Sequence, residues 1–238
     1  MDWGKTKTIF IFTFFILNLV LGYQIYLKQK EYLQDIQSTN SIQELNHILR
    51  LQGIKLTYNL PKEIPELHFI QVKEKKLKRN EIKEPIKLEQ PYNSKLLNAK
   101  LQKTINHFSE YDYDSQESSS NRLVFHQRIE DFPYFSDNLI LQISKGKVIS
   151  YQQEYYEMVD KGPTRQVISA HSALRTALDY QYIPNGSEIK EMKLGFYKQD
   201  YPEDIQILVP VWRIVYQDSE RRGMIYIHAM TGGVEGIH

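Results

Sequence analysis

The first feature of the hydrophobic pattern is an uninterrupted apolar run near the amino terminus. Residues 8–27 contain no charged side chain, whereas Lys5 and Lys7 precede the run and Lys28 and Lys30 follow it. The run has 20 residues, and a helix of that length rises ~30 Å, which matches the hydrocarbon core of a bilayer. The pattern therefore predicts a transmembrane helix over residues 8–27.

The orientation follows from what lies beyond this run. No second hydrophobic span is present, so one side of the membrane holds the whole region after residue 27. Because Lys5 and Lys7 crowd the short segment 1–7, we expect this segment to be a cytoplasmic tail and the C-terminal region to be extracytoplasmic. A cleaved signal peptide is the alternative, with Ile9–Leu21 as its apolar region and a weak cleavage site before Tyr23. We prefer a retained single-pass anchor in the cell membrane, because Tyr23–Leu27 continues the apolar stretch past that site.

One face of the predicted anchor carries a pattern that is typical of helix association. Phe15, Asn18 and Gly22 follow i, i+3, i+7 spacing and therefore share a face. Glycine permits close approach of two backbones, and an asparagine amide can form a hydrogen bond across the contact. We interpret Phe15, Asn18 and Gly22 as a transmembrane contact with a partner helix. The alternative is that a single asparagine is merely tolerated in the span.

Beyond the anchor, residues 28–155 predict a first α+β module. A capping box at Ser41–Glu44 starts a short amphipathic helix that ends near Gly53. A second helix is predicted over residues 94–108. Strands are predicted over residues 67–72, 123–129, 139–144 and 147–153, and Lys145-Gly146 predicts a tight hairpin turn between the last two.

Residues 156–238 repeat this order of elements and predict a second module. An apolar stripe predicts a helix over residues 166–179, and strands are predicted over residues 189–197, 205–216 and 224–230. The fold class is therefore predicted to be α+β, with an N-terminal transmembrane helix followed by two extracytoplasmic modules. Each module is expected to combine a helix with an antiparallel sheet.

Composition narrows the possible functions. The chain has 30 basic and 29 acidic side chains, for a net charge of +1, which argues against nucleic-acid binding because that requires a basic face. It contains no cysteine, which excludes thiolate metal sites, a cysteine nucleophile and a lipoprotein anchor. The basic loop 73–87 either contacts anionic polymers or lipid headgroups, or is a solvated face.

The search for catalytic motifs gives no site. Ser144 and Lys147 match S-x-x-K and Ser136–Asn138 matches S-D-N, but their order is reversed and K-T-G is absent. Asp112 and Asp114 begin an EF-hand-like pattern that lacks the required glycine and distal glutamate. The histidines show no metal-ligand spacing. We predict no catalytic, cofactor-binding or metal-binding residue, although two distant carboxylates of a glycosidase would leave no spacing to inspect.

Several short stretches resemble the YycI family. Residues 1–10 and the following Leu17-Asn18-Leu19 resemble the start of these proteins, and Leu60–Glu63 is similar to the break after the family's first helix. Pro210–Ile214 and Tyr226–Val234 are similar to its closing hairpin, which PepSY-like modules share. The resemblance covers almost the whole chain.

This resemblance implies a function through binding partners. YycI proteins are single-span regulatory partners of the essential cell-wall sensor kinase in low-GC Gram-positive bacteria. The resemblance implies a cytoplasmic N-terminus, a two-part outer region like that of YycH, and a complex with a YycH-like protein and a YycG/WalK-like sensor histidine kinase. No catalytic or cofactor residue carries over. It also implies that contacts between transmembrane helices, here at Phe15, Asn18 and Gly22, regulate the two-component system, with the sign of regulation left open.

The leading hypothesis is thus a non-enzymatic, membrane-anchored regulator of cell-wall homeostasis. One alternative is an extracytoplasmic enzyme that acts on the cell wall, which predicts a cleft with perturbed carboxylates. The other is a PepSY-like module that inhibits a protease. The sequence identifies no small-molecule ligand.

Overall fold

A computed structural model describes residues 3–35, 39–77, 82, 84–88, 92, 94–136, 138–199 and 205–238. The chain divides into two units, Met1–Leu51 and Gln52–His238. The first unit is helical and the second contains all the described strands. Parts of the basic loop 73–87 lie outside the described residues, so the interpretation of that loop stays open.

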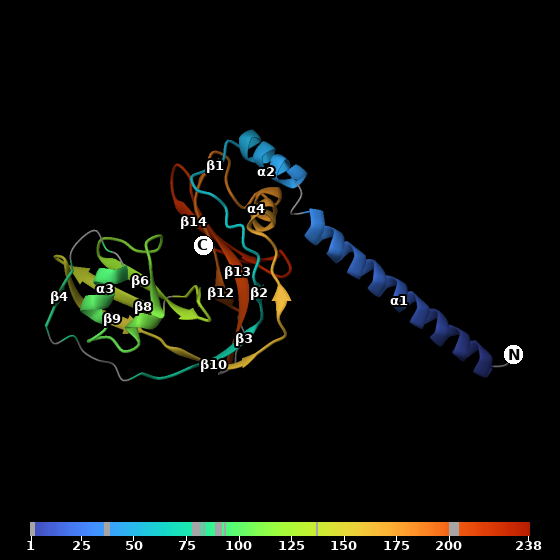
Figure 1. The fold of residues 1–238 in the computed structure, drawn as a ribbon, viewed down its shortest axis with the longest axis horizontal. Coiled ribbons are helices and arrows are strands. Elements are labelled where there is room, and N and C mark those ends of the chain that lie inside the picture. Colours follow the sequence, from blue (N-terminus) through green and yellow to red (C-terminus); the bar gives the residue numbers. More distant parts are fainter. Residues whose placement is uncertain are drawn as a thin grey trace. The chain divides into compact units, whose positions relative to one another are not determined.

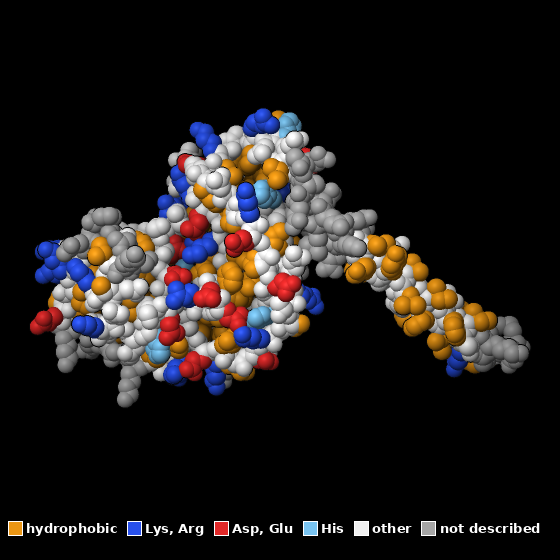
Figure 2. Space-filling view, viewed as in Figure 1, with side chains coloured by type: hydrophobic (Ala, Val, Ile, Leu, Met, Phe, Trp, Pro, Cys, Tyr) orange, Lys and Arg blue, Asp and Glu red, His pale blue; other side chains and the backbone are white. Residues whose placement is uncertain are grey.

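The first unit contains two helices, α1 (Trp3–Asp35) and α2 (Thr39–Leu51). Helix α1 has 33 residues and is ~50 Å long, so it exceeds the thickness of a bilayer core. It includes all of the predicted span, and Lys7–Leu27 is long and apolar enough to cross a membrane. Figure 2 shows hydrophobic side chains along α1 and mixed acidic and basic side chains on the visible face of the strand-rich part.

The second unit is built on a larger sheet of seven strands (Figure 1). Its central strand β13 (Ile205–Gln217) pairs antiparallel with β12 (Glu188–Lys198) along one side. Along the other side it pairs first with β3 (Ile70–Glu74) and then with β14 (Arg222–His228). Three further strands complete the sheet. β1 (Lys55–Leu56) pairs with β12, β10 (Tyr156–Lys161) pairs with β3, and β15 (Val234–Ile237) pairs with β14.

Both faces of β13 are covered, which explains its nearly continuous apolar sequence. The helix α4 (Ala170–Asp179) packs against β13 and β14, and Ser169 caps its first turn by accepting a hydrogen bond from the Ser172 backbone. Trp212 is fully buried, and its indole Nε1 donates to the Ile168 carbonyl at 2.9 Å. Because side chains alternate along a strand, the next residue, Arg213, points to the opposite face.

A smaller sheet faces that side of β13. Its strands are β4 (Ile86–Lys87), β9 (Lys147–Gln153), β8 (Leu139–Ser144), β6 (Arg122–Ile129) and β5 (Tyr111–Asp114), in that spatial order, with β7 (Phe132–Pro133) paired to β6. Helix α3 (Ser94–Leu101) covers one face (Figure 1). The short 3-10 helix Phe108–Glu110 contributes Phe108 to the same core. Leu97 and Leu101 pack there against Phe125 and Leu141. A separate two-stranded pair joins β2 (Glu66–Leu67) to β11 (Arg165–Gln166).

Two predicted helices are shorter than their apolar patterns. The helix predicted over 94–108 ends at Leu101, whose carbonyl accepts bonds from both Thr104 and Ile105, and His107 adopts a left-handed φ of 55°. β-branched residues and asparagine favour helices only weakly, which explains this early end. The helix predicted over 166–179 begins at Ala170, because Ser169 is its N-cap.

The coarse fold prediction is confirmed: a helix that can span a membrane precedes a mostly β region. Strands near the predicted positions are present, and Lys145 and Gly146 have the positive φ values of a tight hairpin turn. The division into modules 28–155 and 156–238 stays a prediction. The larger sheet contains β1 and β3 from the first of these ranges together with β12–β15 from the second.

Candidate functional site

The three predicted transmembrane contact residues lie in the apolar part of α1. Phe15 is 60% exposed, and a side chain built on Gly22 would meet no atom within 4 Å. The Asn18 amide Nδ2 donates to the Phe14 carbonyl at 2.8 Å. At 100° per residue, Phe15, Asn18 and Gly22 fall within an arc of ~60° over two helical turns. Their contact with a partner stays a prediction.

The most strongly charged buried site in the described residues of the second unit lies between the two sheets. Arg213 comes from the centre of β13, and only 1% of its side chain is exposed. It faces Asp114 at the end of β5 and His126 in β6, which are 5% and 3% exposed. Glu117 from the turn after β5 and Glu191 from β12 complete this set, which we call the ion cluster.

The guanidinium of Arg213 holds the ion cluster together. Its Nη1 lies 2.6 Å from Asp114 Oδ2 and 2.9 Å from Glu117 Oε1, while its Nη2 donates to Glu191 Oε1 at 2.6 Å. The guanidinium carbon is 4.4 Å from the centre of the Phe135 ring, which is a cation–π geometry. Asp114 also accepts bonds from the backbone N–H groups of residues 116 and 117, which fixes the turn that carries Glu117.

His126 has an acceptor at each ring nitrogen. Nδ1 lies 2.8 Å from the Ser136 carbonyl and Nε2 lies 3.0 Å from Asp114 Oδ2. Burial alone would lower the pKa of His126, but its bonds to Asp114 and Glu117 outweigh burial and raise the pKa to about 9. The ring is therefore an imidazolium at neutral pH, and both nitrogens donate.

The pKa values of the carboxylates are shifted in the opposite direction, downward. Burial alone would raise the pKa of Asp114, but the bond from His126 and the charge of Arg213 hold it well below its usual range. The same two cations lower the pKa of Glu117. With all five groups ionised, the cluster contains two cations and three anions and has a net charge of −1.

Three members of the cluster have the chemistry of metal ligands. One ligand atom each from Asp114, Glu117 and His126 lie within 4.8 Å of one another. Arg213 Nη1, however, lies 2.6, 2.9 and 3.3 Å from these three atoms. The guanidinium thus occupies the position that a metal ion would take and supplies the positive charge there. The arrangement suits a structural link between sheets better than a metal site.

Beside the ion cluster, a side-chain amide links the smaller sheet to β10. The Gln127 Nε2 donates to the Tyr156 carbonyl at 2.7 Å, and its Oε1 accepts from the Tyr156 N–H at 2.8 Å. The Gln127 backbone N–H donates to Asn138 Oδ1 at 3.0 Å. The amide of Gln127 therefore imitates a neighbouring strand at the edge of β10.

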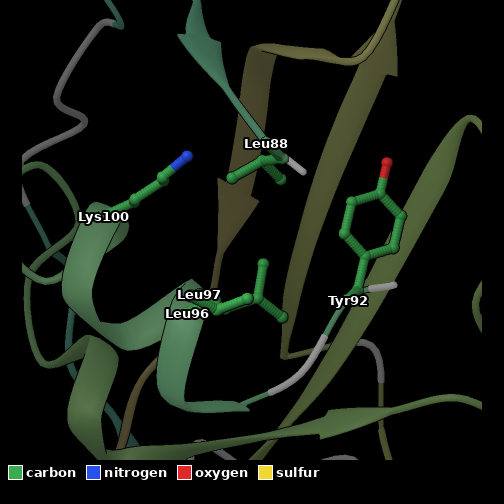
Figure 3. Close-up of a pocket in the computed structure, with 5 residues that line it drawn as sticks. All are labelled: Leu88, Tyr92, Leu96, Leu97 and Lys100. Atoms are coloured by element: carbon green, nitrogen blue, oxygen red, sulfur yellow. The ribbon is translucent and has the colours of Figure 1, made fainter. Parts of the chain in front are cut away.

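A small pocket beneath α3 is a gap in packing (Figure 3). Leu88, Tyr92, Leu96, Leu97 and Lys100 line it, and its volume is about 10 Å³. That is room for about one water molecule. Leu88 and Leu97 belong to the apolar core of the smaller sheet, and a space of this size is far smaller than a ligand pocket.

Sequence reasoning missed the ion cluster, although one signal was present. Arg213 interrupts the apolar segment Val209–Tyr216, and a charge in such a buried strand requires a counter-ion. Asp114 attracts attention in the sequence only as part of an EF-hand-like pattern. Ser144 and Lys147 lie on either side of the hairpin turn between β8 and β9, and Asp137 lies outside the described residues.

Comparisons with known proteins identify the family of the chain. The helix and the mostly β region are compatible with a protein held in a membrane by a single anchor. The model of the YycI protein family matches residues 78–230, which is more than half of the chain, and the chain belongs to the YycI family. This is a regulatory family associated with the YycFG two-component system.

No curated protein matches the chain. Several solved structures, two of which follow, are similar in part. An uncharacterized protein from Eubacterium rectale is 12% identical over 85% of this chain and 83% of its own, with a TM-score of 0.44. The C-terminal domain of YpeB from Bacillus megaterium is 16% identical over 64% of this chain and 67% of its own, with a TM-score of 0.42.

Proposed function

We propose that this protein is a non-enzymatic, single-pass regulator of a YycG/WalK-like sensor histidine kinase and that it acts together with a YycH-like partner. The family match over residues 78–230 carries this proposal, because it assigns the chain to a regulatory family. The apolar helix supports a membrane anchor. We assign the N-terminus to the cytoplasm and the outer region to the extracytoplasmic side. In this arrangement the anchor lies in the same bilayer as the kinase.

The contact with the kinase or its partner is assigned to the face of α1 that carries Phe15, Asn18 and Gly22. Asn18 uses one amide N–H within its own helix. Its side chain has a second N–H and a carbonyl oxygen that a neighbouring helix can bind. Gly22 allows that helix to approach closely.

The free energy of this helix contact is large enough to adjust the balance between two kinase states. An interhelical hydrogen bond of this kind contributes ~0.6–2 kcal/mol. If the contact differs between two kinase states by that amount, their ratio changes about 3- to 30-fold. A shift of this size tunes kinase output but is too small for an all-or-none switch.

Site-specific photo-cross-linking in living membranes tests the proposal. A photoreactive amino acid at positions 15, 18 or 22 is expected to give adducts with the kinase or the YycH-like partner. The matched controls are positions 17, 20 and 24, which lie at similar depths on the opposite face of α1. Equal adducts from both faces, or none from either, would show that this face makes no specific contact.

Substitution of Asn18 provides a second, quantitative test. We expect Asn18→Leu to weaken co-purification of the partner or to change kinase output by about 3- to 30-fold. Thr13→Val is the matched control, because Thr13 also bonds within its own helix, to the Ile9 carbonyl, but lies on the opposite face. Turnover of peptidoglycan fragments by the purified protein would instead support the enzyme hypothesis.

A further inference from the structure

A groove beside the ion cluster has the size of a small-molecule site. Its volume is about 280 Å³, just below the ~300–1,000 Å³ range of ligand pockets. Aromatic rings make up much of its wall, among them Phe135, Tyr197, Tyr226 and the His238 imidazole. The groove therefore opens between the larger sheet and the segment that follows β7, and it does not involve α1.

The rings form one connected group. Tyr197 and Tyr226 stack with their centroids 4.5 Å apart, and His238 meets Tyr226 edge to face at 5.7 Å. Phe135 lies 5.8 Å from Tyr226. The Met224 thioether also lines the groove and accepts a weak bond from the Tyr226 hydroxyl at 3.8 Å. Because Tyr197 and Tyr226 stack on each other and the Arg213 guanidinium covers one face of Phe135, the rings and the Met224 sulfur offer a ligand mainly an apolar wall.

The ion cluster places a negative charge at this wall. Glu117 is the cluster member that lines the groove, and 17% of its side chain is exposed. The cluster as a whole has one anion more than its two cations can neutralise. Burial raises the pKa of Tyr226, and the nearby Glu117 carboxylate raises it further, so the phenol stays neutral.

One cation at the rim opposes this negative charge. Lys198 lines the groove, but its side chain is exposed. Solvent screens an exposed ammonium group more than it screens the partly buried Glu117, whose Oε1 also pairs with Arg213 at 2.9 Å and with His126 at 3.3 Å. Removal of the Lys198 charge should therefore strengthen the binding of a cation.

We propose that this groove binds an alkylammonium group, with Glu117 as its counter-ion and the rings of Tyr197, Tyr226 and Phe135 as its apolar wall. The class includes the quaternary ammonium of choline and the primary ammonium of a lysine side chain. The site is distinct from the face of α1 that carries the proposed kinase contact, so either proposal can fail without the other.

Binding is measured by saturation-transfer NMR on the full-length protein in uncharged maltoside micelles. The probes are choline and n-butylammonium, which distinguish quaternary from primary amines. The neutral control is 3,3-dimethylbutanol, which has the shape of choline without its charge. We expect at least one ammonium probe to bind with a Kd in the millimolar range, ~10-fold or more tightly than the alcohol.

Four variants locate the site and separate charge from folding. Glu117→Gln is expected to weaken ammonium binding ~5-fold or more, and Tyr197→Leu ~3-fold or more, because they remove the counter-ion and a ring. Lys198→Met is expected to strengthen it ~2-fold or more, which unfolding cannot imitate. The control is Glu157→Gln, which removes an exposed carboxylate of β10 that pairs with Lys75. This variant should bind the ammonium probes like the unmodified protein.

The following results would overturn the proposal. Neither ammonium probe shows saturable binding below about 50 mM, or the alcohol binds as tightly as the better of the two ammonium probes. Glu117→Gln, if folded, keeps the affinity of the unmodified protein. If Glu117→Gln does not fold, unchanged or weaker binding by Lys198→Met decides against the proposal.

Discussion

Arg213 Nη1 lies 2.6 Å from Asp114 Oδ2, and this buried pair joins the centre of β13 in the larger sheet to the end of β5 in the smaller sheet. Apolar residues also connect the two sheets, since Tyr134 and Ile129 pack against Phe196. Apolar contacts are tolerant of small shifts, whereas a buried ion pair requires a fixed geometry. The ion cluster therefore adds a directional constraint to the apolar contact between the sheets.

Removal of the Arg213 charge should destabilise the strand-rich unit strongly. Arg213→Met leaves buried carboxylates without their cation, and we expect a loss of about 3–5 kcal/mol in the free energy of unfolding. Arg213→Lys should recover only part of this loss, because lysine cannot bind Glu191 and Asp114 through two separate nitrogens. Denaturant titration of the full-length protein in micelles measures both variants.

Arg128→Met is the matched control for this experiment. Arg128 pairs with Asp112 at 3.1 Å, but its side chain is 39% exposed. Exposed pairs contribute about 0–1 kcal/mol, so this variant should be nearly as stable as the unmodified protein. Equal effects of the two arginine substitutions would show that the ion cluster is not a special link.

The protonated state of His126 predicts a loss of stability in mild alkali. Its pKa is raised from 6.5 to about 9 in the folded protein, so its contribution is complete below pH 6.5 and disappears as the pH rises through 9. The full contribution is about 3 kcal/mol. Denaturant midpoints measured between pH 6.5 and 9.5 should therefore fall continuously.

His126→Gln should flatten this pH dependence, because glutamine does not titrate. Burial lowers the pKa values of His171 and His228, so those groups reduce stability only as the pH falls below 6.5. They act outside the window assigned to His126. A His126→Gln profile that still falls by the same amount between pH 6.5 and 9.5 would assign the effect to another group.

The sequence predicts local structure here much better than it predicts the site. The hairpin at Lys145-Gly146 is correct because two positive-φ residues and flanking alternation are local signals. The end of α3 at Leu101 and the start of α4 after Ser169 each depend on the conformation of a single turn. An apolar stripe does not indicate a helix boundary that finely. Arg213 signals that a buried counter-ion exists, but only the fold brings Asp114 to it from the other sheet.

Gln127 should be important for the edge strand β10. Gln127→Met keeps the side-chain volume but leaves the buried N–H and carbonyl of Tyr156 without their partners. Each unsatisfied group costs about 1–3 kcal/mol. We expect faster amide hydrogen exchange at Tyr156 and a lower free energy of unfolding.

Gln142→Met is the control for this change, because Gln142 lies on the exposed side of β8. It should leave exchange at Tyr156 unchanged. Protection of the Tyr156 amide that persists in Gln127→Met would mean that the amide contact is replaceable, for example by water.

Gly195 controls how closely the segment after β7 approaches β12. Tyr134 forms a parallel bridge with Phe196, and the Phe135 N–H donates to the Phe196 carbonyl at 2.8 Å. A methyl group on Gly195 would lie 2.5 Å from the Pro133 carbonyl oxygen and 2.5 Å from the Phe135 ring. Backbone atoms cannot yield as a flexible side chain can, so Gly195→Ala must separate the two segments.

We expect Gly195→Ala to reduce the free energy of unfolding by about 1–3 kcal/mol, as overpacking in a core usually does. It should also weaken the contact between the Phe135 ring and the Arg213 guanidinium, because Phe135 lies directly against Gly195. Gly162→Ala is the matched control, because its added methyl group would meet Phe69 at an ordinary 3.5 Å. Denaturant titration of both variants checks the prediction, and a Gly195→Ala protein as stable as Gly162→Ala would show that the segment shifts without cost.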